Sequence, residues 1–529
     1  MRTLQHIAIL SAISGFLFLF SLGRMPLTDP DETFYAQTAR EMVEHNEWIT
    51  PTIFGDPQFE KPVLYYWLIE ISYKVFGISE FAARFPSALF GILGVIGIYF
   101  LSRLLFSPLC GLFSGLITAT SGLYLVLARA CVTDMVLMVF VLYCLLFFLY
   151  AWKDRKFSYY ILSSCMAAFA VLTKGPIGLL IPGVVIFSYI VTDRRWTEIK
   201  TLPVISAAAV FSLICLPWYI IAAKLHGETF LSEFFGYHNV TRFLSPEHKI
   251  GSSPFFYIPI LLGGLLPWTP FFLLGSRELI GKNKTGEGLP GYRLFLTVWF
   301  LFVFLFFSVS RTKLITYVFP LFPVLAVMAG RFWERYVTGR EENSRKIVSV
   351  SYFLLIAAAF AGTAAAVIII HHKYNTLAFP VALVCLFFTA GVVLSYFFVS
   401  RNKKYLSFVT IVSVFIVLSV PTGMWIAPVL AESESSKTLA AILNDMAGEK
   451  DPVGGESDNR RGVAFYSGRK KIVDIHQYNN LNDFVSRQEK VWGIMKYKHY
   501  EQLMKKRPDI PLSIIARSGK YILVTNKTV

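Results

Sequence analysis

The sequence predicts an all-α polytopic membrane protein of about thirteen transmembrane helices, followed by a small soluble α/β domain. Of its 529 residues, 55% are hydrophobic and only 16% are charged, whereas soluble globular chains carry about 25% charged residues. The apolar residues are concentrated in runs long enough to cross a bilayer. Hydrophilic sequence is confined to a few segments, of which the longest is 429–529. Disorder is excluded because so apolar a chain does not stay solvated.

Each predicted span is a mostly apolar run of roughly the 20 residues that a transmembrane helix needs. The first lacks a small-residue cleavage site after it, so we interpret it as an uncleaved anchor and not as a signal peptide. The thirteen spans are expected at about 7–23, 85–106, 109–127, 133–152, 157–173, 175–192, 202–222, 254–275, 293–309, 314–330, 347–370, 378–400 and 405–428.

The charges in the connecting segments predict the orientation. With thirteen spans the two termini lie on opposite sides, and the segments on the N-terminal side are short and rich in Lys and Arg. Because basic short loops stay in the cytoplasm, we expect a cytoplasmic N-terminus and a periplasmic C-terminal domain, in a bacterial inner membrane. The net charge of +16 is then mainly a topology signal, and no nucleic-acid partner is expected.

The predicted domains follow from this topology. A transmembrane domain covers 1–428, with two long periplasmic loops at 24–84 and 223–253, and the α/β domain covers 429–529. In that domain, alternating short strands and helices are expected around a flexible loop at Gly454–Arg461. The expected strands are Val463–Ser467, Lys471–Ile475, Val491–Met495, Ser513–Ala516 and Tyr521–Thr525, and the expected helices are Leu481–Gln488 and Tyr500–Lys506.

The first outer loop carries an unusual acidic cluster. Asp29, Asp31 and Glu32 place three carboxylates within four residues, and they repel one another unless a cation or a proton lies among them. Capping of an interfacial helix is the commoner explanation of such a pattern when it is taken alone. The later Glu60-Lys61 step has a similar ordinary explanation as a surface ion pair at a turn.

Further charged residues lie on the same predicted side of the membrane. Lys and Arg at span ends often only extend toward the headgroups, and a single His in a loop is usually just hydrogen-bonded. Positive charge on the outer side nevertheless runs against the topology bias. We therefore expect these cations to gather with the acidic cluster and face a phosphate lipid. The residues are Asp134, Lys174, Arg311 and Lys313 at span ends, and His238 and Arg242 in the second long loop.

At these positions the sequence resembles the GT-C membrane glycosyltransferases of the protein mannosyltransferase and lipid A aminoarabinose transferase group. The resemblance covers nearly the whole chain. Its most specific marks are Asp31-Glu32-x-x-Tyr35-Ala36, Phe59-Glu60-Lys61-Pro62 and Arg84-Phe85-Pro86-Ser87. The supporting marks are Thr133-Asp134, Leu172-Thr173-Lys174-Gly175, His238 with Arg242-Phe243, and Ser310-Arg311-x-Lys313-x-x-x-Tyr317.

The resemblance implies transfer of a sugar from a polyprenyl-phosphate donor at the outer face of the membrane. The implied acceptor is a lipid A-like glycolipid, another envelope glycan or a protein hydroxyl. No nucleotide cofactor is expected, which agrees with the lack of a Walker loop or a Rossmann glycine fingerprint in the sequence. Glycosyl transfer passes through an oxocarbenium-like state while charge builds on the leaving phosphate, so cations and a carboxylate are required.

Residue roles follow by resemblance only. The catalytic candidates are Asp31 and Glu32, and the candidates for the substrate cavity are Tyr35, Asp134, Lys174 and Tyr317. The candidates for the donor phosphate are Lys61, Arg242, Arg311 and Lys313. Glu60 and His238 are candidate ligands of a divalent metal ion (Zn, Mg or Mn), with the substrate phosphate or water completing the site.

The chain also departs from the aminoarabinose transferases, which carry Arg at the position of Phe34 and Glu at the position of Tyr237. Losing a cation beside Asp31 leaves open whether the sugar is aminoarabinose or another hexose or pentose. The alternative function is a polytopic transporter or lipid flippase, which should bury charges near the middle of its spans. The expected spans are nearly free of such charges, which favours an enzyme. A structural envelope protein would leave the two charged outer loops unexplained.

Overall fold

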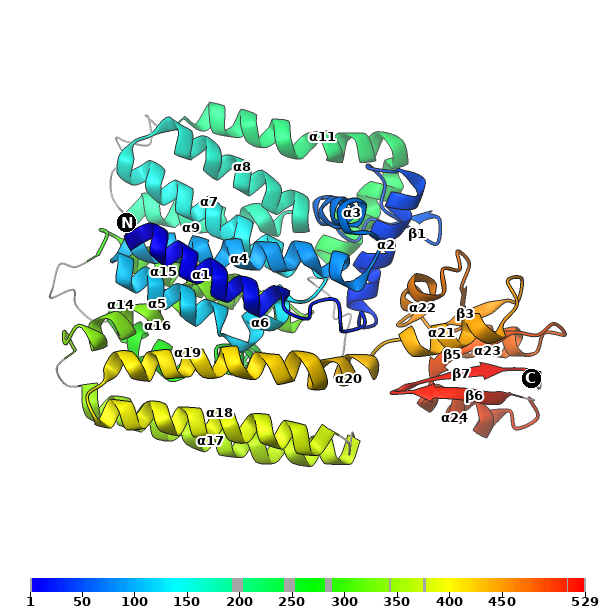
Figure 1. Cartoon of the computed structure of the whole chain (residues 1–529). Coiled ribbons are helices and arrows are strands. Elements are labelled where there is room, and N and C mark those ends of the chain that lie inside the picture. Colours follow the sequence, from blue (N-terminus) through cyan, green and yellow to red (C-terminus); the bar gives the residue numbers. More distant parts are fainter. Residues whose placement is uncertain are drawn as a thin grey trace.

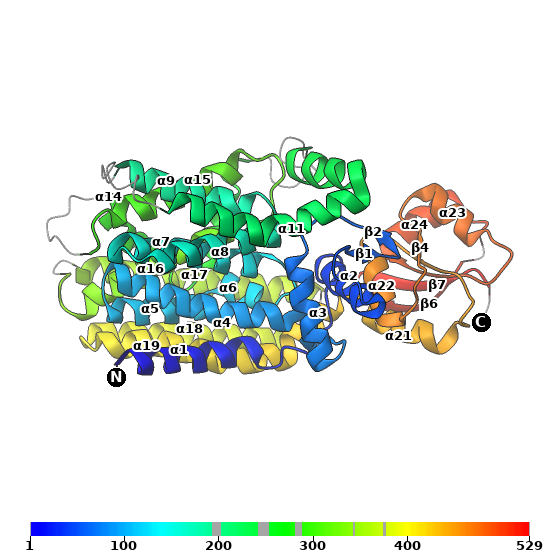
Figure 2. The same ribbon diagram turned by 90° about the horizontal axis from the view of Figure 1, so that it is seen from above.

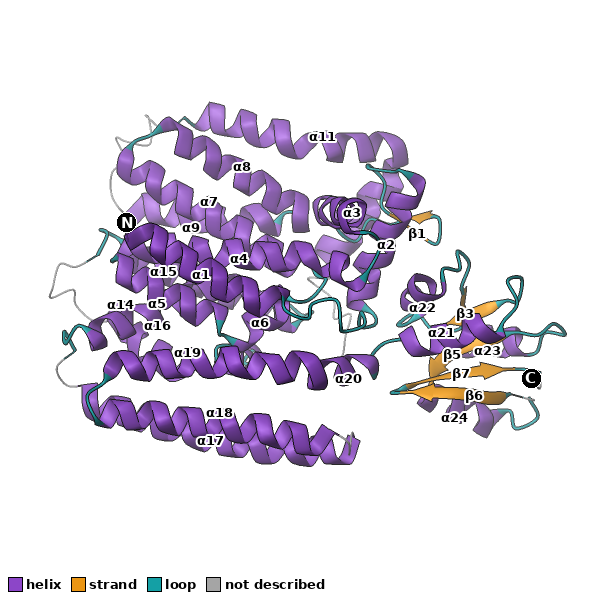
Figure 3. Cartoon of the chain, viewed as in Figure 1, coloured by secondary structure: helices purple, strands orange, loops and turns teal. Residues whose placement is uncertain are grey.

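The computed structural model describes residues 2–192, 203–241, 253–280, 288–341, 344–373, 377–510 and 512–527. In these ranges the chain is a bundle of long helices with a small sheet domain at one end (Figures 1 and 3). The N-terminus lies at the other end of the bundle (Figures 1 and 2).

The helices of the bundle agree with the predicted spans. Ten helical stretches in the described ranges are long and apolar enough to cross a membrane, and two bent helix pairs bring the number to twelve. The remaining expected span corresponds to α9 (Ile177–Thr192), which is apolar but has only 16 residues. The ten stretches are α1 (Arg2–Leu19), α4 (Glu80–Leu105), α7 (Asp134–Asp154), α8 (Phe157–Lys174), α11 (Val204–Phe230) with η1 (Leu231–Thr241), α15 (Tyr292–Val309), η2 (Ile315–Leu321) with α16 (Phe322–Val337), α17 (Ser344–Lys373), α18 (Ala378–Ser400), and α19 (Lys404–Pro421) with η4 (Thr422–Ile426) and α20 (Ala427–Glu432).

The two bent pairs contact each other at their bends. Helices α5 (Pro108–Ala119) and α6 (Gly122–Ala128) meet at 68°, and α13 (Tyr257–Gly264) and α14 (Thr269–Ile280) meet at 112°. The Trp268 indole N–H donates to Thr120 Oγ1 at 2.9 Å, and the Gly122 N–H donates to the Leu266 carbonyl at 3.3 Å. Polar groups freed by a helix break are thereby satisfied within the protein, as an apolar environment requires.

The predicted second loop is partly helical. Helix α11 continues to Phe230 across a kink at Gly227, whose φ is 55°, and η1 extends the helical path to Thr241. The helical path therefore extends past the loop boundary expected at residue 223. Residues 242–252 lie outside the described ranges.

The first outer loop folds at the end of the bundle that carries the sheet domain (Figure 2). It comprises α2 (Asp31–His45), a short antiparallel hairpin of β1 (Thr52–Ile53) and β2 (Asp56–Pro57), and α3 (Leu64–Phe76). These elements bury an aromatic core that includes Tyr65 and Tyr66, so the loop is a packed unit.

The C-terminal domain is a five-stranded mixed sheet with strand order β4-β3-β5-β7-β6. Strand β3 pairs in parallel with β4 and β5, and β7 pairs antiparallel with β5 and β6. The elements are α21 (Lys437–Met446), β3 (Val453–Gly455), α22 (Arg460–Ser467), β4 (Val473–Asp474), α23 (Tyr478–Val485), β5 (Trp492–Lys496), α24 (Tyr497–Lys506), β6 (Ser513–Ser518) and β7 (Tyr521–Thr525).

Two sequence-based assignments in this domain were wrong. The expected strand Val463–Ser467 lies in helix α22. The prediction failed because so short an apolar run has no decisive periodicity. The expected loop Gly454–Arg461 overlaps the end of strand β3 and the start of α22. Glycine is depleted in strands, but a Cβ at Gly454 would lie 2.8 Å from Ile475 and 2.9 Å from Phe484. Glycine therefore lets β3 pass beneath these side chains.

Candidate active site

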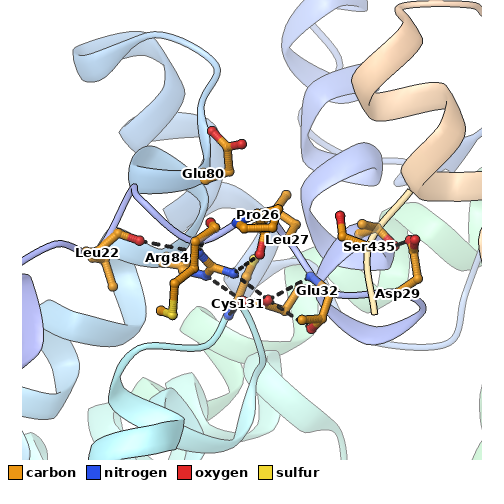
Figure 4. A network of polar contacts seen from close by, with 12 residues as sticks. Leu22, Pro26, Leu27, Asp29, Glu32, Glu80, Arg84, Cys131 and Ser435 are labelled. Atoms are coloured by element: carbon orange, nitrogen blue, oxygen red, sulfur yellow. Dashed lines mark hydrogen bonds and ion pairs between the residues drawn. The ribbon is translucent and has the colours of Figure 1, made fainter. Parts of the chain in front are cut away.

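Glu32 is held in a buried network that joins three parts of the chain (Figure 4). Its Oε1 accepts from Arg84 Nε at 2.7 Å and from the Cys131 N–H at 2.9 Å, and its Oε2 accepts from Arg84 Nη2 at 2.6 Å. The backbone N–H and the hydroxyl of Thr28 also donate to Oε2, both at 3.0 Å. Burial favours the protonated form of Glu32, but Arg84 and the backbone donors hold its pKa below the ordinary value. Glu32 therefore anchors the start of α2.

Asp29 faces the C-terminal domain. Its Oδ1 accepts from the Thr33 hydroxyl at 2.8 Å, and its Oδ2 accepts from the Ser436 N–H at 2.9 Å. Burial raises the pKa of Asp29 to about 7, although these hydrogen bonds oppose the change. The acidic cluster is thus divided, because Asp29 and Glu32 both make structural contacts.

Asp31 is the member of the cluster whose side chain remains exposed, at the first position of α2. The surrounding protein removes part of its water and raises its pKa, and the negative charges of Asp134 and Glu60 raise it further. The positive charge of Arg461 acts in the opposite direction. A carboxylate with a raised pKa is suited to accepting a proton, although Asp31 is not among the residues that line the cavities described next.

A cavity of about 500 Å³ collects six of the candidate residues. It is lined by Glu60, Lys61, Asp134, Lys174, His238 and Tyr317.

The charged groups of this cavity are paired and its remaining wall is largely apolar. Lys61 Nζ lies 3.1 Å from Glu60 Oε1, and Lys174 Nζ lies 2.6 Å from Asp134 Oδ1. The Lys174 ammonium also lies 5.3 Å from the centre of the Tyr317 ring. The lining also includes Phe234 and Phe307. The cavity therefore offers cations to an anionic group next to a surface for hydrocarbon.

The apolar wall continues into a second cavity of about 670 Å³, which shares Pro176, Leu180 and Phe235 with the first. Its lining comes from α8, α9 and α11, and includes Phe187 and Leu216. Together the two cavities provide a charged end and a long apolar extension. This combination fits an amphiphile with an anionic head and an isoprenoid or acyl tail.

The other candidate residues lie elsewhere. Tyr35 is buried, with its ring centre 5.3 Å from that of Tyr65. Lys313 is buried, and its ammonium donates to the carbonyls of Ser308 and Ser310 at the end of α15. Arg311 is exposed. Arg242 lies outside the described residues.

Glu60 and His238 line the same cavity, as expected for a shared metal ion. Among the described residues, however, no group of three or more His, Cys, Asp or Glu side chains is placed to bind a metal. Catalytic zinc sites use three protein ligands, so these two side chains do not make a complete site.

Sequence reasoning missed Arg461. This residue of α22 stacks on Phe34 of α2, with its guanidinium carbon 4.6 Å from the ring centre. Residues 34 and 461 belong to segments that the sequence does not link, so no motif could have paired them.

The chain has relatives among known proteins. A family model described as dolichyl-phosphate-mannose-protein mannosyltransferase matches residues 60–221. The undecaprenyl phosphate-alpha-4-amino-4-deoxy-L-arabinose arabinosyl transferase of Edwardsiella ictaluri is 32% identical over 338 residues, which cover 61% of this chain and 58% of that protein. The match therefore spans less than two thirds of that relative. The transferase of the same name from Photorhabdus laumondii is 26% identical, over 94% of this chain and 90% of its own length.

Solved structures share the fold. ArnT from Cupriavidus metallidurans, bound to undecaprenyl phosphate, matches with a TM-score of 0.82 at 21% identity, over 99% of this chain and 98% of its own. The archaeal oligosaccharyltransferase AglB from Archaeoglobus fulgidus matches with a TM-score of 0.56 at 13% identity, over 95% and 68%. At 21% and 13% identity, both likenesses show the fold alone.

Proposed function

We propose that this chain, which resembles the GT-C membrane glycosyltransferases of the aminoarabinose transferase group in sequence and fold, is a polyprenyl-phosphate-dependent glycosyltransferase. The observation that carries the proposal is the paired cavity: Lys61 and Lys174 stand at its charged end, and an apolar extension continues beside α9. A polyprenyl phosphate has the matching distribution of charge and hydrocarbon.

In the proposed reaction the donor phosphate binds at Lys61 and Lys174. Their ammonium groups offset the negative charge that develops as the bond between the anomeric carbon and the phosphate oxygen breaks. Asp134 keeps Lys174 in place through the 2.6 Å ion pair. The isoprenoid tail of the donor occupies the apolar extension, and polyprenyl phosphate is the leaving group.

Asp31 is the proposed catalytic carboxylate. It orients the acceptor hydroxyl and takes up its proton as the acceptor oxygen bonds to the anomeric carbon. Glu32, with both oxygens occupied, is assigned instead to positioning α2. Lys313 is assigned to holding the end of α15 because its ammonium is engaged with backbone carbonyls. Arg242 and Arg311 stay predictions that rest on the resemblance.

A metal at Glu60 and His238 also stays a prediction. A divalent ion would add positive charge at the donor phosphate, but it would need substrate or water oxygens to complete its ligands. We therefore assign no step of the reaction to it. Assays with EDTA and with Glu60→Ala or His238→Ala test the point: loss of stimulation by added metal is expected, and an EDTA-insensitive enzyme would make both residues structural.

The relatives suggest the first substrates to test. Their names specify aminoarabinose carried on undecaprenyl phosphate. Because Phe34 stands where the aminoarabinose transferases carry an arginine, donors with other hexoses and pentoses should be tested as well. The acceptor classes are lipid A-like glycolipid, envelope glycan and protein hydroxyl. We place residues 1–428 in an inner membrane with a cytoplasmic N-terminus, and 429–529 in the periplasm. Cysteine labelling from outside intact spheroplasts tests this orientation.

The decisive experiment is mass spectrometry of lipid A and envelope glycoproteins from cells with and without the protein. A sugar-sized mass difference in one acceptor class is expected, and it should be lost in Asp31→Asn protein that inserts normally. Identical profiles, together with no transfer by the purified protein from any polyprenyl-phosphate sugar, would overturn the proposal.

A further inference from the structure

The C-terminal domain is attached directly to the segment that bears Asp31. Helix α22 lies beside α2 (Figures 1 and 2). Arg40 Nη1 donates to the Phe465 carbonyl at 2.7 Å, and the Leu27 N–H donates to the Tyr466 hydroxyl at 2.6 Å. A Cβ on Gly462 would lie only 2.2 Å from Asp29 Oδ1. The close approach at glycine fixes the position of the residue before it, Arg461.

Arg461 is half-buried and stacked on the Phe34 ring, which itself packs edge-on against Tyr35 and Tyr66. Stacking holds the plane of the guanidinium and leaves its N–H edge available. No carboxylate or carbonyl in the described part of the chain forms an ion pair or hydrogen bond with this guanidinium. Its charge nevertheless acts on the Asp31 carboxylate and on the Tyr66 hydroxyl. Arg461 is thus a cation with unused donors that is held against Phe34, three residues along α2 from Asp31.

We propose that the C-terminal domain completes the active site, and that Arg461 is its substrate-binding residue, which holds a phosphate oxygen of the donor or acceptor beside Asp31. Arginine binds phosphate through paired N–H donors, and such charge-assisted bonds are stronger than neutral ones. The inference rests on the proposed function, since that function supplies phosphate-bearing substrates. It gives the C-terminal domain a direct part in catalysis.

The chain offers a matched control in the neighbouring Arg460. This residue also links the C-terminal domain to the first outer loop, with its guanidinium carbon 3.9 Å from the centre of the Phe54 ring, and its Nε donates to the Ile472 carbonyl at 2.6 Å. The charges that act most strongly on the pKa of Asp31 include Arg461 but not Arg460. Arg460→Gln therefore removes a comparable arginine–aromatic contact without removing the proposed phosphate ligand.

The test compares full-length Arg461→Gln, Arg461→Lys and Arg460→Gln in nanodiscs. One arm measures the Kd for undecaprenyl phosphate, and the other measures the KM and kcat for lipid A that carries both of its phosphates. Because one charge-assisted bond is lost, Arg461→Gln should raise the Kd or the acceptor KM about tenfold or more. Arg461→Lys should restore part of this loss, and Arg460→Gln should stay within about twofold.

The arm that responds identifies the source of the phosphate: a raised Kd assigns the donor, and a raised KM alone assigns the acceptor. An Arg461→Gln effect less than about fivefold larger than that of Arg460→Gln in both arms would overturn the inference. The binding arm needs no turnover. It therefore still tests Arg461 if every transfer assay fails and the proposed function falls: a raised Kd then supports the donor assignment, and an unchanged Kd overturns the inference.

Discussion

Asp31 and Glu32 are adjacent carboxylates that should respond in opposite ways to replacement by the isosteric amide. In Glu32→Gln, one acceptor oxygen becomes an NH₂ group, which cannot accept from Arg84 or from its other donors. Arg84 is only 2% exposed, so its charge would remain buried without a full counter-charge. In Asp31→Asn the exposed carboxylate loses its charge and its capacity as a base, while the packing is retained.

The magnitudes separate the two variants. Removing one partner of a buried ion pair costs about 3–5 kcal/mol, a large part of the roughly 5–15 kcal/mol that stabilises a typical domain. Glu32→Gln should therefore lower the thermal midpoint by several degrees. Asp31→Asn should leave the midpoint unchanged and lower kcat by about 10²- to 10⁴-fold, the usual contribution of a general base.

The assay pairs tryptophan-fluorescence melting of the purified protein with transfer rates measured well below both transitions. Folded Glu32→Gln is expected to keep a rate within about tenfold of the parent, because its role is to hold α2. The reasoning would be refuted if Glu32→Gln melted like the parent but had no activity, or if Asp31→Asn transferred sugar at the parental rate.

Three further predictions concern other contacts of the site. Asp29 has a folded-state pKa of about 7 against an ordinary value of 3.8. Its stabilising contribution is therefore complete below about pH 4 and is lost as pH rises through 7. The thermal midpoint should fall from pH 5 to 8, and it should fall less steeply in Asp29→Asn. Gly462→Ala should loosen the C-terminal domain, since the new Cβ would overlap Asp29; limited proteolysis should cut faster near residue 436, and an unchanged digest would contradict this. Lys174→Met should lower kcat/KM at least about tenfold through loss of phosphate binding. Adding Asp134→Asn to Lys174→Met should lower kcat/KM little further, because the two side chains act as a pair. Additive losses of kcat/KM would argue against that coupling.

The features that the sequence predicted well are those that depend on local composition. An apolar run of about 20 residues identifies a span wherever it packs, so the helices were found; the largest shift is at the end of α11, which runs to Phe230 and not to residue 222. The convergence of Lys61, Lys174 and His238 on one cavity was expected because topology placed all three on the same side of the membrane.

The features that the sequence could not predict depend on where a side chain points. Nothing near Glu32 indicates that its partner is Arg84, 52 residues away, or that Asp31 would remain exposed beside it. Lys313 carries the charge expected of a phosphate ligand, yet its ammonium reaches back to its own backbone. Helix α22 was mistaken for a strand because its conformation is decided by packing on α2, from the other end of the chain.

The hydrogen bond between Asp29 and Ser436 spans 407 residues of sequence, which has a consequence for biogenesis. Ribosomes add roughly 5–20 residues per second, so the N-terminal partner waits on the order of half a minute before its C-terminal partner is made. Throughout that interval the first outer loop lacks the surface that fixes it. Membrane insertion and completion of the first outer loop are therefore separate events: in a nascent chain with every span in place but no C-terminal domain, Asp29 would still lack its Ser436 partner.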